Sequence, residues 1–248
     1  MTDFISLRNI SKCYSAAGRS VFALKDLSLD IRENEFLAVV GRSGSGKTTL
    51  LRILASLEEP TAGEMRFRGK LCSPENPLPS GMVFQDARLM PWLSALENII
   101  FAFPPRERTA ELHEAAKKML ETVGLSGCER SMPRELSGGM AQRVALGRAL
   151  IKNPSVILLD EPLGALDYFT RRAMQRELIR IYLQEKKSFI MVTHDVGEAL
   201  RMGTRVIVLG EGQMRKEINV DFSYPRPRSD PRFQRLIDEV LDAIGDGE

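Results

Sequence analysis

Hydrophobic and polar positions follow two different patterns along the chain. In residues 4–31 apolar side chains alternate with polar ones, which predicts two or three antiparallel strands with a turn at residues 15–18. Later segments are short apolar runs, the pattern of strands that are buried on both faces: residues 36–40, 156–160, 188–193 and 205–209. Because helical patterns separate these runs, the chain is predicted to be an α/β protein with a mostly parallel core sheet.

The helical patterns place apolar residues three or four positions apart. They predict helices from the region of Lys47 to Leu57, from Ser94 to Pro104, over 109–123, after Gly139 and over about 168–184. Ser94 and Glu97 match a capping box, in which each side chain bonds the other residue's main-chain N–H. Short strands are predicted at 64–68 and 81–84, with a proline-rich loop at 72–80. The segment at about 88–150 is expected to be a helical subdomain inserted between core strands.

The same patterns divide the chain into a main domain at residues 1–215 and a tail at residues 216–248. The tail contains a basic, proline-rich stretch at residues 224–228, which predicts an extended backbone. It ends in a short amphipathic helix whose apolar face consists of Phe233, Leu236, Ile237, Val240, Leu241 and Ile244. This face is expected to pack on the domain, and docking on a membrane or a partner is the alternative.

The composition is that of an ordinary globular protein, with 43% hydrophobic and 27% charged residues. A net charge of +2 does not indicate nucleic acid as a partner. The cysteines, Cys13, Cys72 and Cys128, lack metal-binding spacing and suit a reducing compartment. Neither a membrane-spanning run nor a signal peptide is evident, so any role at a membrane is expected to depend on a partner.

The most specific chemical signal follows the apolar run at residues 36–40. This loop consists of Gly41, Arg42, Ser43, Gly44, Ser45, Gly46, Lys47 and Thr48, with Thr49 directly behind it. It fits the spacing G-x-x-x-x-G-K-[ST] between a strand and a helix, the setting of a phosphate-binding loop. Lys47 can contact the β- and γ-phosphates, and the Thr48 hydroxyl can ligate Mg²⁺. A turn that only connects strand to helix is the alternative, but the context favours a site for a nucleotide such as ATP.

A pair of carboxylates follows the apolar run that ends at residue 160. Asp160 is suited to hold Mg²⁺, directly or through water, as enzymes with a phosphate loop require. Glu161 points elsewhere and is suited to polarise an attacking water. An isolated Asp-Glu pair is usually a solvated strand end, but its place after a buried strand and a phosphate loop favours a functional site.

A further glycine-containing stretch introduces a family resemblance. Residues 136–143, which include Ser137, Gly138 and Gly139, resemble the signature motif of the ABC (ATP-binding cassette) ATPases. Backbone N–H groups at such a helix start can bind an anion. A helix entry that binds no ligand is the alternative for a Ser-Gly-Gly sequence taken alone.

Other stretches are similar to the remaining motifs of this family, in the family's order. Residues 159–162 resemble its magnesium-binding strand end, residues 165–167 its D-loop, and His194 its switch histidine. Gln85 matches its Q-loop and Tyr14 its adenine-stacking aromatic residue. The resemblance covers roughly residues 4–212 and leaves only the tail outside.

The resemblance implies a P-loop NTPase fold with an N-terminal antiparallel β subdomain and a helical subdomain inserted after Gln85. It also implies that two copies of the chain form a head-to-tail sandwich around two ATP molecules. In that sandwich, Ser137, Gly138 and Gly139 of one copy contact the γ-phosphate bound by the other copy. The family assigns catalysis to Glu161, His194 and Lys47, ligation of Mg²⁺ to Thr48, Gln85 and Asp160, and stacking on adenine to Tyr14.

Residues 83–92 and 160–167, together with the basic tail, look like the ATPases of nitrate, sulfonate and taurine importers. This resemblance implies an ATPase at the inner face of the cell membrane, working with a separate integral membrane permease and, indirectly, a solute-binding protein. The helical insert, including Trp92 and Leu93, would then receive a helix of the permease; a locally packed tryptophan is the alternative.

Other classes of ABC protein remain open at this point. They are the ATPase of an exporter or lipoprotein-release system, a soluble ABC ATPase acting on DNA or ribosomes, and a nucleotide-binding switch that does not hydrolyse ATP. Nucleic acid is not an expected partner, since the chain has one cassette and no long coiled-coil insertion. A small-molecule kinase is disfavoured because no motif suggests an acceptor site.

Overall fold

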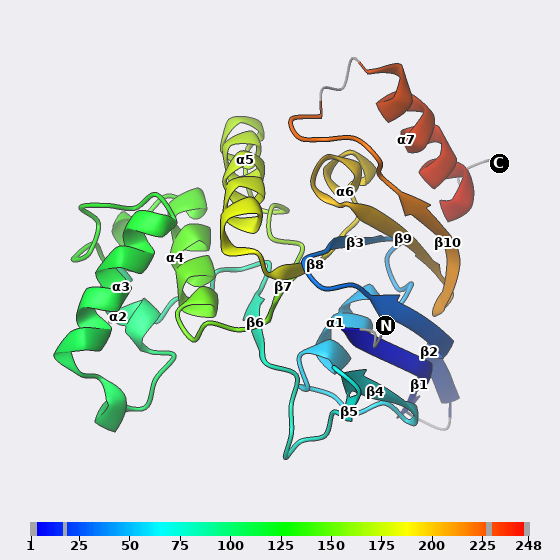
Figure 1. Cartoon of the computed structure of the whole chain (residues 1–248), viewed down its shortest axis with the longest axis horizontal. Helices are drawn as coiled ribbons and strands as arrows, with labels where there is room; N and C mark the ends of the chain where they lie inside the picture. Colours follow the sequence, from blue (N-terminus) through cyan, green and yellow to red (C-terminus); the bar gives the residue numbers. More distant parts are fainter. Residues whose placement is uncertain (1–3, 17–18, 227–229, 246–248) are drawn as a thin grey trace. The chain divides into compact units, whose positions relative to one another are not determined.

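The structure is a computed structural model that describes residues 4–16, 19–226 and 230–245 (Figure 1). It divides into two compact units, the first comprising Met1–Leu78 and Ser188–Glu248 and the second Pro79–Lys187. Two residues of the predicted turn, Ala17 and Gly18, lie outside the described part of the chain, as do Pro227 and Arg228 of the tail.

An antiparallel sheet in the first unit confirms the predicted alternation. Its strands are β1 (Ile5–Ala16), β2 (Arg19–Ile31), β4 (Ala62–Phe67) and β5 (Lys70–Leu71), in the order β2-β1-β4-β5. Leu7 is paired with Leu29 across β1 and β2, and both side chains are buried. Residues 5–16 and 19–31 thus form two long strands, and the pattern predicted two or three.

The first unit also contains the buried strands that position the phosphate loop: β3 (Phe36–Val40), β8 (Ser188–Thr193) and β9 (Arg205–Gly210). Beside them lies a mostly exposed strand, β10 (Gln213–Asn219). Strand β3 lies between β8 and β9 and is parallel to both, whereas β10 is antiparallel to β9. All residues of β3 are buried, which explains its unbroken apolar run. Helices α1 (Lys47–Leu54), α6 (Val196–Met202) and α7 (Pro231–Ile244) belong to the same unit.

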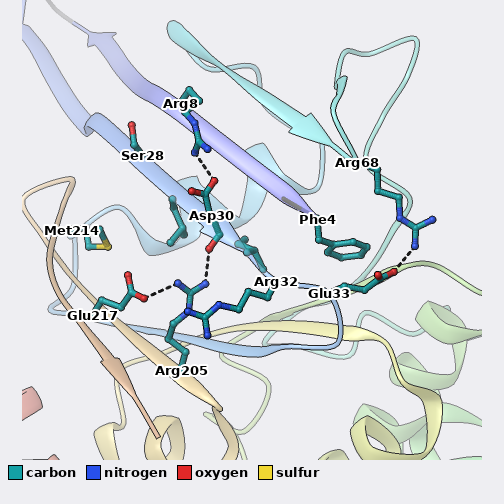
Figure 2. A pocket seen from close by; sticks show the side chains of 12 residues that line it. Phe4, Arg8, Ser28, Asp30, Arg32, Glu33, Arg68, Arg205, Met214 and Glu217 are labelled. Carbon is teal, nitrogen blue, oxygen red and sulfur yellow. Dashed lines mark hydrogen bonds and ion pairs between the residues drawn. The ribbon is translucent and has the colours of Figure 1, made fainter. Parts of the chain in front are cut away.

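A buried ion pair connects the start of β3 to β9. Arg205 Nε donates to Glu35 Oε1 over 2.7 Å, and both side chains are only 4% exposed. Figure 2 shows that Arg205 also reaches Glu217 on β10, at 2.9 Å, and the main-chain oxygen of Asp30, at 2.6 Å. Burial by itself would lower the pKa of Arg205, but the hydrogen bonds to Glu35 and Glu217 raise that pKa above its ordinary value. The guanidinium therefore stays charged and fixes β2, β3, β9 and β10 together.

Replacing Glu35 with alanine is expected to lower the free energy of unfolding by about 3–5 kcal/mol, because Arg205 would keep a buried charge without this carboxylate. Urea denaturation measures the effect. Glu33→Ala is the matched control: Glu33 pairs with Arg68 at 2.5 Å, but both side chains are more than half exposed. That substitution should cost no more than about 1 kcal/mol. Equal losses for the two variants would show that burial of the pair is unimportant.

The second unit contains a parallel strand pair and a group of helices. Strands β6 (Ser80–Val83) and β7 (Val156–Asp160) are parallel, with Val83 opposite Leu159. The helices are α2 (Ala95–Ile100), α3 (Ala110–Thr122), α4 (Gly138–Leu150) and α5 (Tyr168–Glu185), with 3₁₀ turns η1 (Pro105–Glu107) and η2 (Pro133–Glu135). Helices α2, α3 and α4 meet at Gly147, where a Cβ atom would lie 2.9 Å from Ile99 Cδ1 and 3.3 Å from Met119 Cγ (Figure 1).

Several predicted boundaries differ from the structure. Helix α1 ends at Leu54 rather than Leu57, because Ser56 adopts a left-handed conformation (φ 55°) and leaves Leu57 exposed. The capping box of Ser94 and Glu97 is confirmed, but α2 ends at Ile100, before Pro104 is reached. Helix α6 and strand β10 are not among the predicted elements. Strand β10 contains residues on both sides of the predicted domain boundary at 215 and 216.

The helix of the tail packs on the first unit, as predicted. Phe233 and Val240 on α7 are fully buried, and Lys216 of β10 forms an ion pair with Glu239 at 2.9 Å. One basic residue of the tail is structural rather than available to a partner. Arg226 is buried and donates to the main-chain oxygens of Leu200, at 2.9 Å, and Gly203.

Candidate nucleotide-binding site

The phosphate loop runs from the end of β3 to the start of α1 and is tightly packed. A Cβ atom on Gly41 would lie 2.2 Å from the main-chain oxygen of Leu209. Gly46, the N-cap of α1, has a left-handed conformation (φ 99°), and a Cβ atom there would lie 2.2 Å from the oxygen of Ala23. Both positions therefore require glycine, which explains the spacing in the sequence.

Two side chains inside this loop fit a phosphate group. The Lys47 ammonium is buried and donates to the main-chain oxygens of Gly41, at 2.8 Å, and Arg42, at 2.9 Å. The Ser45 hydroxyl is buried and has no hydrogen-bond partner among the described residues. Buried polar atoms of this kind are rare in native proteins unless a ligand or water satisfies them. A phosphate oxygen next to Lys47 and the N-terminus of α1 would satisfy this hydroxyl.

The donors also fit a magnesium nucleotide. Thr48 is exposed in the first turn of α1, where its hydroxyl is accessible to a bound ion. Mg²⁺ is commonly held by one or two protein oxygens together with substrate phosphates, so this hydroxyl is a suitable ligand.

Tyr14 lies close to the phosphate loop, at the end of β1. Its hydroxyl donates to Glu58 Oε2 over 2.7 Å. The pKa of Tyr14 is raised by partial burial and by the bond to Glu58, while a bond to the Thr49 side chain acts in the opposite direction. Thr49 is in the first turn of α1, so the phenol reaches the residue next to Thr48. This position is compatible with a base that stacks on the ring while its phosphates occupy the loop.

Removal of the Tyr14 ring should weaken ATP binding about 2- to 10-fold, as the loss of one aromatic stack would. Titration of Tyr14→Ala with a fluorescent ATP analogue measures this change. Tyr14→Phe retains the ring but loses the hydrogen bond to Glu58, and it should bind nearly as well as the unmodified protein. Unchanged affinity in the alanine variant would exclude Tyr14 from the adenine site.

His194 follows β8 next to the phosphate loop. Thr193 is paired with Val40 across the parallel strands β8 and β3. His194 and Gly41, which directly follow these two residues, therefore lie next to each other at the carboxyl ends of the strands. The turn is fixed by its neighbours: Asp195 N donates to Thr193 Oγ1 over 3.1 Å, and Glu198 N donates to Asp195 Oδ1 over 2.9 Å. His194 itself is exposed at this edge.

The second unit brings three further predicted residues together. Asp160 ends β7, and Gln85 follows the adjacent parallel strand β6. Glu161 has a left-handed backbone (φ 44°), a strained conformation for a residue other than glycine and one that often marks a functional site. A Cβ atom on Gly164 would lie 3.2 Å from Gln85 Nε2 and 3.7 Å from Glu161 Oε2. The Gln85 amide and the Glu161 carboxylate therefore both lie next to Gly164.

The signature stretch forms the N-terminus of α4 in the same unit. Ser137 is the N-cap, and its Oγ accepts from Met140 N over 3.3 Å. Ser137 and Gly138 are exposed, and Gly139 is buried against α5. The free N–H groups and positive end of the helix dipole make this turn suitable for an anion.

Gln142 of the signature helix has a structural role that the family motif does not indicate. Gln142 is buried, and its Nε2 donates to the main-chain oxygens of Phe84, at 3.2 Å, and Gln85. The side chain thus connects the helix that presents Ser137 to the residue that follows β6. The sequence signal for this contact is that Gln142 is a polar residue among the apolar residues on the buried side of α4.

The predicted site residues therefore form two groups, each placed by its own unit. In the first unit, Tyr14, His194 and residues 41–49 surround the ends of β3 and β8. In the second unit, Gln85, Asp160 and Glu161 lie at the ends of β6 and β7, and residues 137–139 begin α4. The first group can bind a nucleotide, and the second provides carboxylates and an anion-binding turn.

Comparison with known proteins identifies the family. The ABC transporter family matches residues 24–164. An uncharacterized ABC transporter ATP-binding protein of Methanocaldococcus jannaschii is 41% identical over 249 aligned residues, which cover 98% of this chain and 91% of the relative. The aliphatic sulfonates import ATP-binding protein SsuB of Bacillus thuringiensis is 39% identical, over 98% of this chain and 96% of its own length.

Solved structures agree with this assignment. A dimeric ATP-binding cassette in a post-hydrolysis state, bound to ADP and Pi, is 34% identical with a TM-score of 0.77, and the match covers 88% of this chain and 100% of that one. The similarity confirms the predicted P-loop NTPase fold. Within the described ranges, no helix is both long and apolar enough to cross a bilayer. The chain therefore belongs to the ABC transporter family and is an ATP-binding protein that hydrolyses ATP.

Proposed function

We propose that this chain is the ATPase subunit of an ABC importer for small oxyanionic solutes of the sulfonate, nitrate or taurine type. The observation that carries the proposal is the extent of the similarity to sulfonate import ATPases. The match to the SsuB protein of Agrobacterium fabrum, for example, is 41% identical over 96% of this chain, well beyond the segment that the family as a whole shares.

The proposed catalytic unit is a head-to-tail pair of copies that encloses two ATP molecules. In one copy, residues 41–48 hold the phosphates and Tyr14 stacks on the base. The second copy places Ser137, Gly138 and Gly139 against the γ-phosphate, where their N–H groups neutralise charge that develops during transfer. The dimeric form of related cassettes supports this arrangement.

Hydrolysis is proposed to proceed by in-line attack of water on the γ-phosphorus. Glu161 accepts the proton of that water, and His194 orients it against the γ-phosphate. Lys47 compensates the charge of the transferring group. Thr48, Gln85 and Asp160 are the residues that would hold Mg²⁺, which would supply further charge compensation for the phosphates. Loss of the γ-phosphate removes the link between the copies, so the sandwich opens.

The permease is proposed to contact the loop that follows Gln85. Trp92 is 69% exposed there, so it is not a locally packed side chain. The buried Asn98 side chain fixes this loop: its Oδ1 accepts from Met90 N over 2.7 Å, and its Nδ2 donates to Leu93 O over 2.9 Å. A rigid loop that displays an exposed aromatic residue is suited to receive a partner helix. The same loop begins at Gln85, which connects this contact to the ATP site.

Through the permease, the chain would lie at the cytoplasmic face of the cell membrane, and a solute-binding protein would deliver the solute from outside. Reconstitution of the chain with its cognate permease and binding protein in proteoliposomes tests the proposal. ATP-driven accumulation of an alkanesulfonate, taurine or nitrate is expected. Outward transport would indicate an exporter, and ATP hydrolysis that responds to DNA or ribosomes instead would indicate a soluble ABC ATPase.

A further inference from the structure

Two adjacent aromatic side chains at the start of α5 are exposed. Tyr168 is 59% exposed and Phe169 is 81% exposed. Their rings pack edge to face, with centroids 5.5 Å apart and an interplanar angle of 81°. Arg172, one turn further along, donates to the Tyr168 hydroxyl over 3.1 Å. The aromatic pair, Tyr168 and Phe169, is thus held in a defined orientation although most of its surface faces solvent, as is typical of an anchor for a partner.

This aromatic pair is continuous with the signature turn of the same unit. A Cβ atom on Gly139 would lie 2.5 Å from Thr170 Cγ2, and one on Gly138 would lie 3.4 Å from Leu166 Cδ2. The N-terminus of α4 therefore packs directly on the first turn of α5 and on the residues before it. Asp167 caps that turn and accepts from Phe169 N over 3.0 Å. Ser137 and the aromatic pair consequently belong to neighbouring helix starts.

We propose that the aromatic pair is an apolar anchor of the ATP-bound dimer and inserts beside the phosphate loop of the second copy. The inference rests on the proposed function, in which Ser137 of one copy faces the γ-phosphate bound by the other. Since the first turn of α5 contacts the signature turn, the aromatic pair would approach the same surface of the second copy, next to its phosphate loop.

That surface contains a cavity of suitable size and chemistry. A cavity of about 400 Å³ is lined by residues 42–45 of the phosphate loop together with Glu211, Arg215, Ala243 and Ile244. Volumes of this order accommodate small ligands, so an aromatic side chain can enter. Ala243 and Ile244, at the end of α7, provide apolar contact.

The charged lining of this cavity also complements the aromatic pair. The guanidinium groups of Arg42 and Arg215 can pack on aromatic faces. Arg42 is held in place because its Nη2 donates to the main-chain oxygen of Gly245 over 2.8 Å. Glu211, whose side chain is 80% exposed, pairs with Arg215 at 2.8 Å and so holds that guanidinium at the cavity. The helix of the tail would thereby form part of the dimer surface.

The test compares dimerisation of variants in a Glu161→Gln background, in which ATP should stay bound. Phe169→Ser is expected to raise the dissociation constant of the ATP-bound dimer by about tenfold or more, as removal of an interface anchor does. Leu183→Ser is the matched control, because Leu183 is a 56% exposed apolar residue near the other end of α5. This control should change the constant by no more than about twofold. Sedimentation velocity at saturating Mg·ATP measures both.

The possible results are distinguishable. Equal dissociation constants for Phe169→Ser and Leu183→Ser would overturn the inference while leaving the proposed dimer intact, and would be expected if the aromatic pair served the permease. Failure of the Glu161→Gln background itself to dimerise would overturn the proposed sandwich and the inference with it. Weaker ATP binding to the monomer in Phe169→Ser would also count against an interface role.

A cross-link tests the receiving cavity separately. In a background where Cys13, Cys72 and Cys128 are replaced by serine, Phe169→Cys and Ile244→Cys should form a disulfide between copies only when ATP is present. ATP-independent cross-linking, or none in a dimer that still depends on Phe169, would exclude the cavity beside the phosphate loop as the docking site.

Discussion

Replacing Glu161 with glutamine is expected to lower ATP turnover by about 10²- to 10⁴-fold, because the amide cannot accept a proton from the attacking water. ATP binding should persist, since the phosphate loop belongs to the other unit and is unchanged. The left-handed backbone at position 161 is as accessible to glutamine as to glutamate, so the fold should be retained. Release of inorganic phosphate and equilibrium binding of ATP, measured on the same preparation, separate the two effects.

Glu121→Gln is the control for this prediction. Glu121 is an exposed residue of α3 in the same unit, and the substitution changes the net charge equally. Its turnover should equal that of the unmodified protein. Full steady-state hydrolysis by Glu161→Gln would remove Glu161 from the catalytic mechanism and leave His194 as the remaining candidate for activating the water.

Replacing Lys47 with alanine should weaken ATP binding by about 10- to 100-fold, the effect of losing a charged hydrogen bond to a phosphate. Lys47 also donates to the carbonyls of Gly41 and Arg42, so its removal leaves the loop less well ordered before ATP arrives. Hydrolysis at saturating ATP should fall as well, because the ammonium compensates the charge of the transferring phosphoryl group. Isothermal titration with ATP and a phosphate-release assay measure the two consequences.

Lys70→Ala provides the comparison for this second prediction, because Lys70 is an exposed lysine of the short strand β5. Both its ATP affinity and its turnover should be unchanged. If Lys47→Ala retained normal affinity and turnover, the Ser45 hydroxyl and the N–H groups of the loop would have to bind the phosphates without it.

Elements that depend on neighbouring residues are predictable from this sequence. The apolar run at residues 36–40, the glycine spacing that follows and the capping box at Ser94 each have a local physical cause, and the structure confirms each of them. Part of the candidate site is predictable for the same reason, because Gly41, Asp160 and His194 lie at the ends of apolar runs that are recognisable in the sequence.

Features that depend on distant residues are not predictable from pattern alone. Glu35 and Arg205 are 170 positions apart, so no local signal indicates their buried ion pair. Strand β10 contains three consecutive charged residues, Arg215, Lys216 and Glu217, as edge strands often do, and these hide its alternation. The contact of Gln142 with Phe84 and Gln85 likewise appears only when α4 is placed against β6.

The central claim is that each copy completes the other copy's ATP site with Ser137, and oligomeric state tests it most directly. In saturating Mg·ATP, sedimentation velocity should show Glu161→Gln as a dimer. Adding Ser137→Asp should make it monomeric, because aspartate still caps α4 but places a negative charge against the γ-phosphate, whereas the neutral cap in Ser137→Asn should preserve the dimer. A dimer that is unaffected by Ser137→Asp, or a Glu161→Gln protein that remains monomeric, would contradict the account.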